Sequence, residues 1–499
     1  MKVLMLGWEF PPHISGGLGT ACFGMTRGLD EIGVEVAFVL PTAVPVDMAG
    51  RSHVKLCGPN MAPAAVGDLP VDLTMAGIGA AGGDLATGDA GEGTFTTVAI
   101  EGMGHVALHH VPAVLQAYAT PETFKEVMAA LTPEQQVQVR HVLERMQAEA
   151  EQPDAPASPG AGQQGAPQGA SQAAPGPLVP AGAFDKGPGL HYGGDLMGQI
   201  RRYAAMVVRV AQAETFDVIH AHDWMTYPAG LAVAAASGKP LVVHVHSTEF
   251  DRSGENVNTQ IYDIERAGMH GADQVVCVSY LTRNIAANRY GVPASKLDVV
   301  YNAVDLPADG DSLAMTPIRP NEKLVLFLGR VTMQKGPEYF LEAAKKVTEK
   351  FTNVRFVMAG SGDMIAQCVR QVADLKLGRY VTFTGFLRGD DVARIFRMAD
   401  LYVMPSVSEP FGIAPLEALS HNVPVIISKQ SGVSEVLTHV LKIDFWDVDE
   451  MANKILAVLR HPPLQRTLRQ HGAIELRKFS WRDSAVKLRK IYSALVDAE

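Results

Sequence analysis

The chain has 499 residues, of which 47% are hydrophobic and 19% charged, and its formal net charge is −10. This length and balance predict a globular protein with two large domains rather than a single core. The negative charge argues against a nucleic-acid-binding protein, because such binding depends on neutralising phosphates with Lys and Arg side chains. A protein with this net negative charge can still contain a local basic site for an anionic ligand.

The cysteines and the apolar runs indicate a cytoplasmic protein without an integral membrane segment. The four cysteines lie far apart and form no CxxC pair, which favours buried reduced thiols over disulfides or a metal cage. They are Cys22, Cys57, Cys277 and Cys368. Residues 1–7 are too short for a signal peptide, and no stretch reaches the roughly 18 apolar residues of a membrane helix.

Strands and helices alternate along the first 305 residues. Residues 3–7 are continuously apolar, as in a buried parallel strand, and a loop with Pro11 and Pro12 separates them from a helix that ends near Leu29. Further strands are expected at 34–40, 217–221, 241–246, 274–278 and 297–300, and a helix at 194–212. Between 45 and 190 the pattern is weaker.

Two features stand out in that weaker region. Thr120 and Thr132 precede Pro at the first position of expected helices. Residues 153–188 are mostly Ala, Gly, Pro and Gln, which predicts a flexible insertion within the first domain.

A polar stretch at about 305–321 marks the expected domain junction, and alternation then restarts. Strands are expected at 324–328, 354–359, 381–384, 401–404 and 423–427, and helices at 337–350, 363–375, 390–398, 412–420 and 449–460. A last helix follows Ser480 as its N-cap. We therefore expect an α/β protein with two doubly wound, Rossmann-like domains, 1–305 and 306–479, and a ligand cleft between the carboxyl ends of their strands.

Gly16 and Gly17 precede the first helix, where the backbone can approach a ligand and the helix N-terminus favours an anion. A tight turn for packing is the alternative. A dinucleotide fingerprint would place its first glycine directly after the strand, so the intervening Pro-Pro loop argues against an NAD-dependent dehydrogenase.

The second domain carries two cations and two carboxylates next to strand ends. Arg330 and Lys335 follow the strand 324–328 and can clamp a diphosphate, unless they are only solvated loop residues. Glu409 lies in the loop after strand 401–404, and Glu417 lies in the helix that follows. One carboxylate can face a reacting sugar and the other a ribose. The alternative is a pair of surface glutamates.

The helix that carries Glu417 also offers backbone donors. The amides of Gly412, Ile413 and Ala414 lie at its N-terminus and are free to bind oxygens of a sugar or phosphate.

In order and spacing, these motifs resemble the retaining glycosyltransferases of the GT-B fold. The match is closest to glycosyltransferase family 4, with similarity to bacterial glycogen and starch synthases, over residues 1–40 and 191–499. The motifs are Gly16–Gly17, the segment 220–224, Gly329–Arg330, Gln334–Lys335–Gly336, and Glu409 with Glu417. The resemblance also implies that the helix 480–499 crosses back to the first domain, although packing on its own domain is the alternative.

The resemblance implies roles for the donor-side residues. Arg330 and Lys335 would hold the donor diphosphate and stabilise its departure. Glu409 would lie near the transferred sugar, and Glu417 would bind the ribose. The paired glycines 16 and 17 would approach the diphosphate from the opposite domain.

Five further residues are assigned less directly by the resemblance. His246 would hydrogen-bond the sugar, unless it is a satisfied core histidine. Asp223 and Trp224 would shape the acceptor side, or else cap a helix and fill space. Phe386 and Leu387 would contact the nucleotide base.

The implied function is a retaining transferase that moves a hexose, with glucose favoured, from a UDP- or ADP-linked donor to a carbohydrate acceptor such as an α-glucan. The rivals are a GT-B epimerase or hydrolase and a non-catalytic nucleotide-sugar-binding protein. Glycogen synthases carry an early Lys-Thr-Gly-Gly and a tyrosine at the position of Glu417. This chain has Ile14–Ser15 before the glycines, so the pattern favours family 4. The sugar, acceptor and oligomeric state stay open.

Two Asp-x-Asp spellings, 309–311 and 447–449, match the metal motif of GT-A transferases. Asp309 falls in the expected linker, and Asp449 reads better as the N-cap of a helix 450–460. We therefore expect no metal and no other cofactor.

Overall fold

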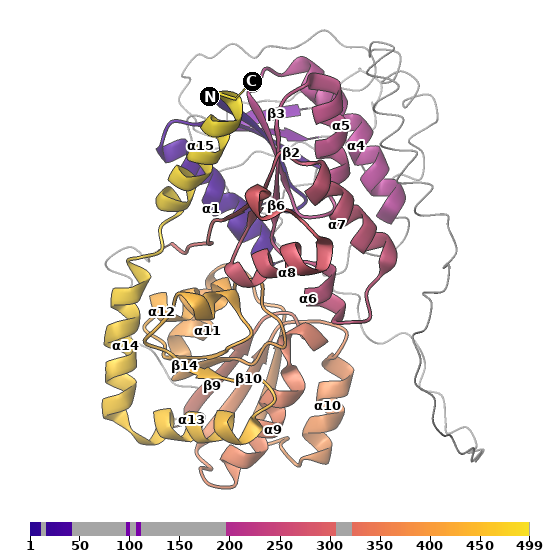
Figure 1. Cartoon of the computed structure of the whole chain (residues 1–499). Coiled ribbons are helices and arrows are strands. Elements are labelled where there is room, and N and C mark those ends of the chain that lie inside the picture. The colour runs from indigo at the N-terminus through magenta and orange to yellow at the C-terminus, as the bar shows by residue number, and fades with distance from the viewer. Residues whose placement is uncertain (11–15, 42–95, 100–105, 111–195, 306–321, 499) are drawn as a thin grey trace, which may run out of the picture.

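The computed structural model describes residues 1–10, 16–41, 96–99, 106–110, 196–305 and 322–498. It has two lobes, each built around its own sheet (Figure 1). The helix starts expected at Thr120 and Thr132, the insertion 153–188 and Cys57 lie outside the described residues.

The first lobe contains an eight-stranded sheet of order β3-β4-β2-β1-β5-β6-β7-β8. Neighbouring strands are parallel except for the antiparallel pair β3–β4. The strands are β1 (Lys2–Leu6), β2 (Glu35–Leu40), β3 (Thr96–Ala99), β4 (Val106–His110), β5 (Val218–His222), β6 (Leu241–Val245), β7 (Gln274–Cys277) and β8 (Leu297–Val299).

Helices cover both faces of this sheet, because successive side chains of a strand point to opposite faces and those of β1 are apolar on both. In β1, Val3 and Met5 pack in one hydrophobic cluster, and Leu4 and Leu6 pack in another. The helices of the lobe are α1 (Gly17–Glu31), α4 (Leu196–Ala213), α5 (Tyr227–Ser237), α6 (Glu249–Ser253), α7 (Thr259–Gly271) and α8 (Tyr280–Tyr290).

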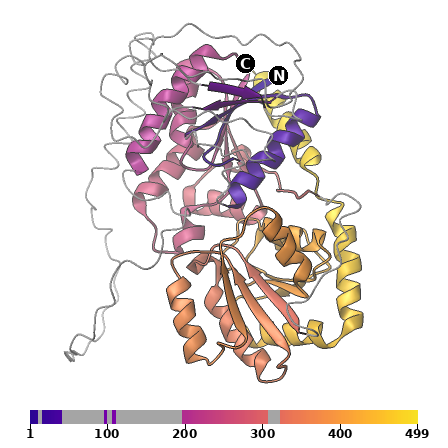
Figure 2. The same cartoon turned by 180° about the vertical axis from the view of Figure 1, so that it is seen from behind.

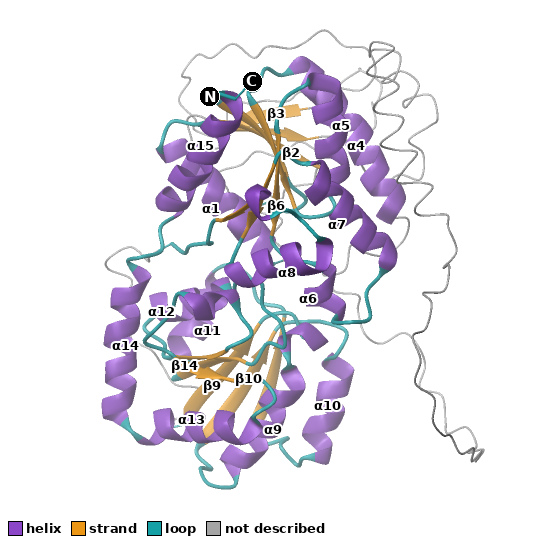
Figure 3. Cartoon of the chain, in the orientation of Figure 1, coloured by secondary structure: helices purple, strands orange, loops and turns teal. Residues whose placement is uncertain are grey.

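The second lobe contains six parallel strands in the order β11-β10-β9-β12-β13-β14. They are β9 (Lys323–Leu328), β10 (Val354–Ala359), β11 (Val381–Gly385), β12 (Leu401–Met404), β13 (Val425–Ser428) and β14 (Leu441–Ile443). Its helices are α9 (Pro337–Thr348), α10 (Ile365–Asp374), α11 (Asp390–Met398), α12 (Ile413–Ser420), α13 (Val448–Arg460) and α14 (Pro462–Leu476). Figure 3 shows the strands of each lobe at its centre with helices around them. The prediction of two Rossmann-like units is confirmed.

The last helix, α15 (Trp481–Val496), leaves the second lobe and packs against α1 of the first. Both views show the two helices side by side (Figures 1 and 2). Glycines permit this close approach: a Cβ added to Gly24 would lie 2.0 Å from the Trp481 ring, and one added to Gly28 would lie 2.4 Å from the Trp481 carbonyl oxygen. The last helix therefore packs on the lobe that contains β1.

Two predicted N-caps differ from the structure. Ser480 occupies the N-cap position of α15, but its side chain accepts no capping hydrogen bond. Asp449 is not the N-cap of α13. Asp447 holds that position and accepts from the Glu450 amide at 2.8 Å, because the helix begins two residues earlier than expected. Asp449 instead pairs with Lys346 at 2.7 Å.

Cys22, Cys277 and Cys368 are buried and free, and burial raises the pKa of each thiol. Among the described residues, no helix has the length and apolar character needed to span a bilayer.

Candidate active site

The loops at the carboxyl ends of β9 and β10 are packed tightly together. A Cβ added to Gly360, whose φ is 146°, would lie 1.8 Å from the carbonyl oxygen of Gly329. Arg330 follows Gly329 and is exposed. Lys335 ends the 3-10 helix η3 (Met333–Lys335), and Gly336 has a positive φ of 62° against the Pro405 carbonyl oxygen. These loops therefore place both predicted cations at the carboxyl edge of the sheet.

Lys335 and Glu409 form an ion pair, with 2.6 Å between Nζ and Oε2. The Ser406 hydroxyl donates to the same carboxylate oxygen at 3.1 Å. The Glu409 backbone is also fixed: its amide donates to the Gln430 carbonyl, and its carbonyl accepts from the Gly432 amide, both at 2.9 Å. Two residues 74 positions apart thus meet in a partly buried, well-supported pair.

Glu409 and Glu417 lie close to one buried phenol. The Tyr402 hydroxyl donates to the Leu328 carbonyl at 3.2 Å, and burial, followed by the two nearby glutamates, raises the Tyr402 pKa. Burial also raises the pKa of Glu417 to about 7. The structure therefore groups Lys335, Glu409 and Glu417. Arg330 makes no ion pair with any described carboxylate.

The N-terminus of α12 lies directly beside Glu409. Gly412 is its N-cap with φ 100°, and an added Cβ there would lie 3.2 Å from Glu409 Cγ. Ile413 and Ala414 are the first residues of the helix, so their amides have no intrahelical acceptor. Phe386 follows β11, is 45% exposed, and has the Arg388 guanidinium 5.3 Å from its ring centre. Leu387 is half-buried.

In the first lobe, His246 directly follows β6 and contacts a second histidine. His222 Nδ1 lies 2.9 Å from His246 Nε2. His220 and His244 complete a buried group on the same face of β5 and β6, because residues two apart in a strand share a face. Burial lowers the pKa of His220 and His246 to about 3, so the rings are neutral.

The histidine group contains two sets of potential metal ligands whose donor atoms lie within 4.8 Å of one another: Cys22 with His222 and His246, and His220 with His222 and His244. The ring planes of His220 and His244 differ by only 6° at a centroid distance of 5.3 Å. A metal ion lies close to the plane of each imidazole that binds it, so two stacked rings cannot both bind one ion without turning. For the set of His220, His222 and His244, the geometry therefore favours a stack of neutral rings over a metal site.

Asp223 lies at the end of β5 in a left-handed conformation, with φ 65°. Burial raises its pKa to about 7, although Arg252 and the backbone amides of Ser247 and His246 oppose the rise. It is not a helix cap, since Thr226 holds the N-cap position of α5. Trp224 is 4% exposed and packs in the hydrophobic core, which supports the space-filling interpretation.

We expect Asp223→Asn to stabilise the protein more at pH 8 than at pH 5. The folded-state pKa of about 7 exceeds the ordinary value of 3.8 for an aspartate, so the folded protein keeps a proton that the unfolded chain releases, and stability falls as pH rises through this window. Two pH units separate pH 5 from the folded-state pKa, so at about 1.4 kcal/mol per unit the stability difference between the two proteins should change by at most about 3 kcal/mol from pH 5 to pH 8. Asparagine tolerates the positive φ.

Urea unfolding of both proteins at pH 5 and pH 8 measures this difference. A stability difference that does not change with pH would show that the buried carboxylate is not the cause.

Gly16 and Gly17 lie at the N-terminus of α1, and a Cβ added at either position would meet no atom of the described residues within 4 Å. They differ in this from glycines 24 and 28, which are tightly packed further along the same helix.

Several residues that contact the predicted site were not identified from the sequence. Asp251 and Ser279 of the first lobe hydrogen-bond to Ser408 and to the Pro410 carbonyl, on either side of Glu409. One feature of the sequence could have identified Asp251. It lies three residues after Thr248, at the position where an acidic side chain completes the capping box at a helix N-terminus.

Two family models match the chain. The model described as Glycosyltransferase Family 4 matches residues 173–307, and the one described as Glycosyl transferases group 1 matches residues 312–474. They cover, respectively, the described part of the first lobe from α4 to β8 and most of the second lobe.

Among curated proteins, an uncharacterized glycosyltransferase of Methanocaldococcus jannaschii is 34% identical over 239 residues, which are 45% of this chain and 61% of that protein. A D-inositol 3-phosphate glycosyltransferase of Pseudarthrobacter chlorophenolicus is 27% identical over 56% of this chain and 71% of its own length. The matched region thus spans about three fifths of the first relative.

Among solved structures, sucrose-phosphate synthase from Thermosynechococcus elongatus superposes with a TM-score of 0.64 at 16% identity, over 100% of both chains. The catalytic domain of starch synthase IV from Arabidopsis thaliana, bound to ADP and acarbose, gives a TM-score of 0.61 at 14% identity, over 100% of this chain and 99% of that one. At these identities the structures establish the fold. The family models and the fold agree: residues 173–307 and 312–474 match the models described as Glycosyltransferase Family 4 and Glycosyl transferases group 1, and the two lobes share the fold of these solved structures.

Proposed function

We propose that the protein transfers a hexose, with glucose favoured, from a nucleotide-diphosphate sugar to a carbohydrate acceptor, with retention at the anomeric carbon. The observation that carries this proposal is the partly buried Lys335–Glu409 ion pair beside the N-terminus of α12. A cation, free helix amides and a carboxylate at one sheet edge suit a ligand that is anionic at its phosphates and becomes positive at its sugar.

In this proposal, Lys335 and Arg330 neutralise the departing diphosphate. The amides of Ile413 and Ala414 bind phosphate or sugar oxygens, and Glu409 faces the reacting sugar. Preorganised charges of this kind stabilise a transition state without reorganising at the moment of reaction. The diphosphate is then held by protein groups alone, without a metal ion. The nucleotide is UDP or ADP, and Gly16–Gly17 approach it from the first lobe.

Three further contacts complete the proposed donor site. His246 hydrogen-bonds the sugar from the first lobe. Glu417 binds the ribose. Phe386 and Leu387, which follow β11, contact the base, with the exposed Phe386 ring offering a stacking face.

An α-glucan is the first acceptor to examine, and Asp223, at the end of β5, faces the acceptor side. An epimerase or hydrolase would use the same donor site but would need no acceptor, and a non-catalytic binding protein would release no nucleotide. A panel of UDP- and ADP-linked hexoses, each with and without glucan, maltose or inositol phosphate, separates these cases by nucleotide release and product analysis.

We expect acceptor-dependent nucleotide release from at least one donor, and a product with the anomeric configuration of the donor. Glu409→Ala should reduce this rate by roughly 10²-fold or more, as for loss of one preorganised group in an active site. Donor binding with no transfer across the whole panel would contradict the proposal and favour a binding protein.

A further inference from the structure

The short helix α6 of the first lobe contacts the loop that carries Glu409 in the second. The Ser408 hydroxyl donates to Asp251 Oδ1 at 2.6 Å, across 157 positions of sequence. The other oxygen of Asp251 accepts from the Thr248 amide and the Thr248 hydroxyl, both at 2.7 Å. One carboxylate therefore closes the N-terminus of α6 and reaches into the opposite lobe.

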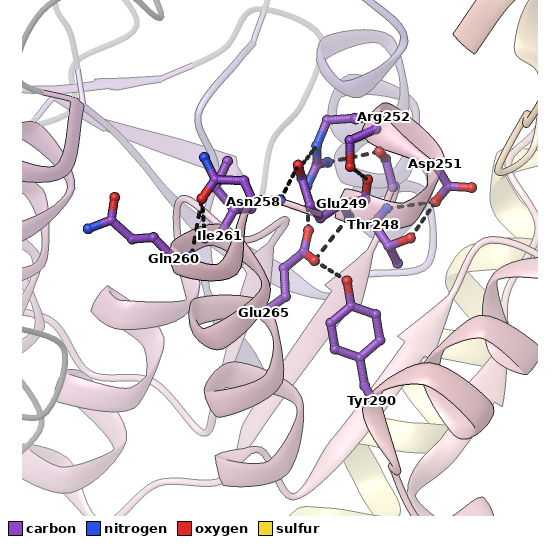
Figure 4. Close-up of polar contacts among 11 residues, drawn as sticks. Thr248, Glu249, Asp251, Arg252, Asn258, Gln260, Ile261, Glu265 and Tyr290 are labelled. Atoms are coloured by element: carbon purple, nitrogen blue, oxygen red, sulfur yellow. Dashed lines mark hydrogen bonds and ion pairs between the residues drawn. The ribbon is translucent and has the colours of Figure 1, made fainter. Parts of the chain in front are cut away.

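Buried charges hold α6 in place (Figure 4). Arg252 pairs with Glu249 at 3.1 Å and also with Glu265, while the Glu249 amide donates to Glu265 Oε2 at 3.0 Å. The Tyr290 hydroxyl donates to Glu265 as well. A buried charge is very costly unless it keeps its partners, so each of these groups resists displacement. The network makes α6 a fixed support for Asp251.

The residue on the other side of Glu409 is also bonded to the first lobe. The carbonyl of Pro410 accepts from the Ser279 hydroxyl at 2.6 Å and from the Thr282 hydroxyl at 3.3 Å. Ser279 is the N-cap of α8, so its position is set by a helix end. Both neighbours of Glu409 are thus tied to the first lobe, while its own carboxylate is tied to Lys335.

The same loop is bonded to the segment that carries Lys335. The amide of Val407 donates to the Gln334 carbonyl at 2.9 Å, and the Ser408 amide donates to it at 3.4 Å. In the first lobe, Asp251 lies five residues after His246. The hydrogen bond between Ser408 and Asp251 therefore joins the two segments that carry the donor-site cation and the sugar-facing histidine.

We infer that Asp251 and Ser279 are positioning residues, which hold Glu409 and the Lys335–Glu409 pair in register with His246 when the two lobes are together. This inference rests on the proposed transfer reaction. Neither residue touches the donor; each acts through the residue that flanks Glu409. Correct placement of the carboxylate matters because a shift of about 1 Å in a reacting group can cost roughly 10²-fold in rate.

Ser408→Ala tests the inference, because it removes the cross-lobe hydrogen bond and leaves both bonds between Asp251 and Thr248. We expect kcat for transfer to fall roughly 10- to 100-fold, within the range for a misplaced group. The KM for the donor should change less than about threefold, since the donor contacts proposed in the second lobe are retained. Ser408→Thr keeps the hydroxyl and should restore most of the rate.

Ser237→Ala is the matched control. Its hydroxyl donates to the Val233 carbonyl at 2.8 Å and accepts from the Lys239 amide at 3.3 Å, so the variant also loses side-chain hydrogen bonds, but none between lobes. We expect wild-type kcat from it. Amide hydrogen exchange of residues 406–412 gives a second readout that needs no substrate: it should become faster in Ser408→Ala and stay unchanged in Ser237→Ala.

A Ser408→Ala enzyme with wild-type kcat and wild-type exchange in this loop would overturn the inference and leave the transfer reaction standing. Wild-type protein that transfers no sugar would instead end the proposed function, and faster exchange in the variant would then show a cross-lobe contact without a catalytic role.

Discussion

Lys335→Ala is expected to lower the rate of nucleotide release from the donor by roughly 10²- to 10³-fold, the loss that follows removal of one preorganised charge or donor from an active site. In the structure, Lys335 Nζ lies 2.6 Å from Glu409 Oε2, and both side chains are largely enclosed. The variant loses the cation that offsets the charge of the departing diphosphate. Steady-state kinetics with the donor found in the panel measures the effect.

The same variant leaves Glu409 without its ion-pair partner, so a loss of stability has to be separated from a loss of catalysis. Breaking a buried pair by removing one partner costs about 3–5 kcal/mol. The double variant Lys335→Ala/Glu409→Gln carries no unpaired charge here and should regain much of that stability without regaining activity. Recovery of both would show that Lys335 acts only through folding.

Lys346→Ala is the control for Lys335. Lys346 lies in α9 and pairs with Asp449 on the surface. The Lys346→Ala variant therefore loses an ion pair of similar length, but one that contributes little to stability. Its activity should equal that of the wild type. A fully active Lys335→Ala enzyme would contradict the proposed diphosphate clamp.

Trp481→Ala is expected to destabilise the first lobe by about 3–5 kcal/mol, the usual cost of truncating a buried aromatic side chain. Trp481 is 4% exposed and its ring lies against Gly24 of α1, in the same hydrophobic cluster as Leu29 and Leu488. Its loss leaves a cavity between α1 and α15. Urea unfolding measures the change, and amide hydrogen exchange should place it in these two helices.

Trp446→Ala provides the comparison, because Trp446 is 57% exposed in the loop after β14. The free energy of unfolding of the Trp446→Ala variant should differ from that of the wild type by no more than about 0.5 kcal/mol. Equal losses from the two tryptophan variants would mean that α15 contributes little to the first lobe.

The strands and their end loops could be predicted from the sequence because buried parallel strands are short, continuously apolar runs. Strands β10 and β12 have the predicted limits, and most others differ by one or two residues. The strands β3 and β4, which fall in the region of weak pattern, were not predicted, and neither were the three-residue strand β14 (Leu441–Ile443) and the helix α14 (Pro462–Leu476). A strand of three residues shows no distinguishable periodicity, and a helix that begins with two prolines resembles a loop.

The candidate site was predictable only in part. Lys335 and Glu409 could be assigned because each follows a strand of one parallel sheet, and such strand ends meet at one edge. Trp224, which belongs to the same family motif as Asp223, lies in the core, and Arg330 is exposed without a described ion pair. Motif membership alone therefore does not separate residues at the strand ends from residues that fill the core.

The sequence by itself determined that two α/β units of similar design are present and which side chains stand at their strand ends, since both follow from local runs of apolar residues and from glycine and proline. Only the tertiary structure decided that Asp251 meets Ser408 and that Ser279 meets Pro410, across separations of 157 and 131 residues. The resemblance implied that the last helix crosses back to the first domain, and the structure decided this over packing on its own domain and placed α15 against α1. Such contacts depend on how the two lobes and the last helix pack, and short-range patterns in the chain carry no record of that packing.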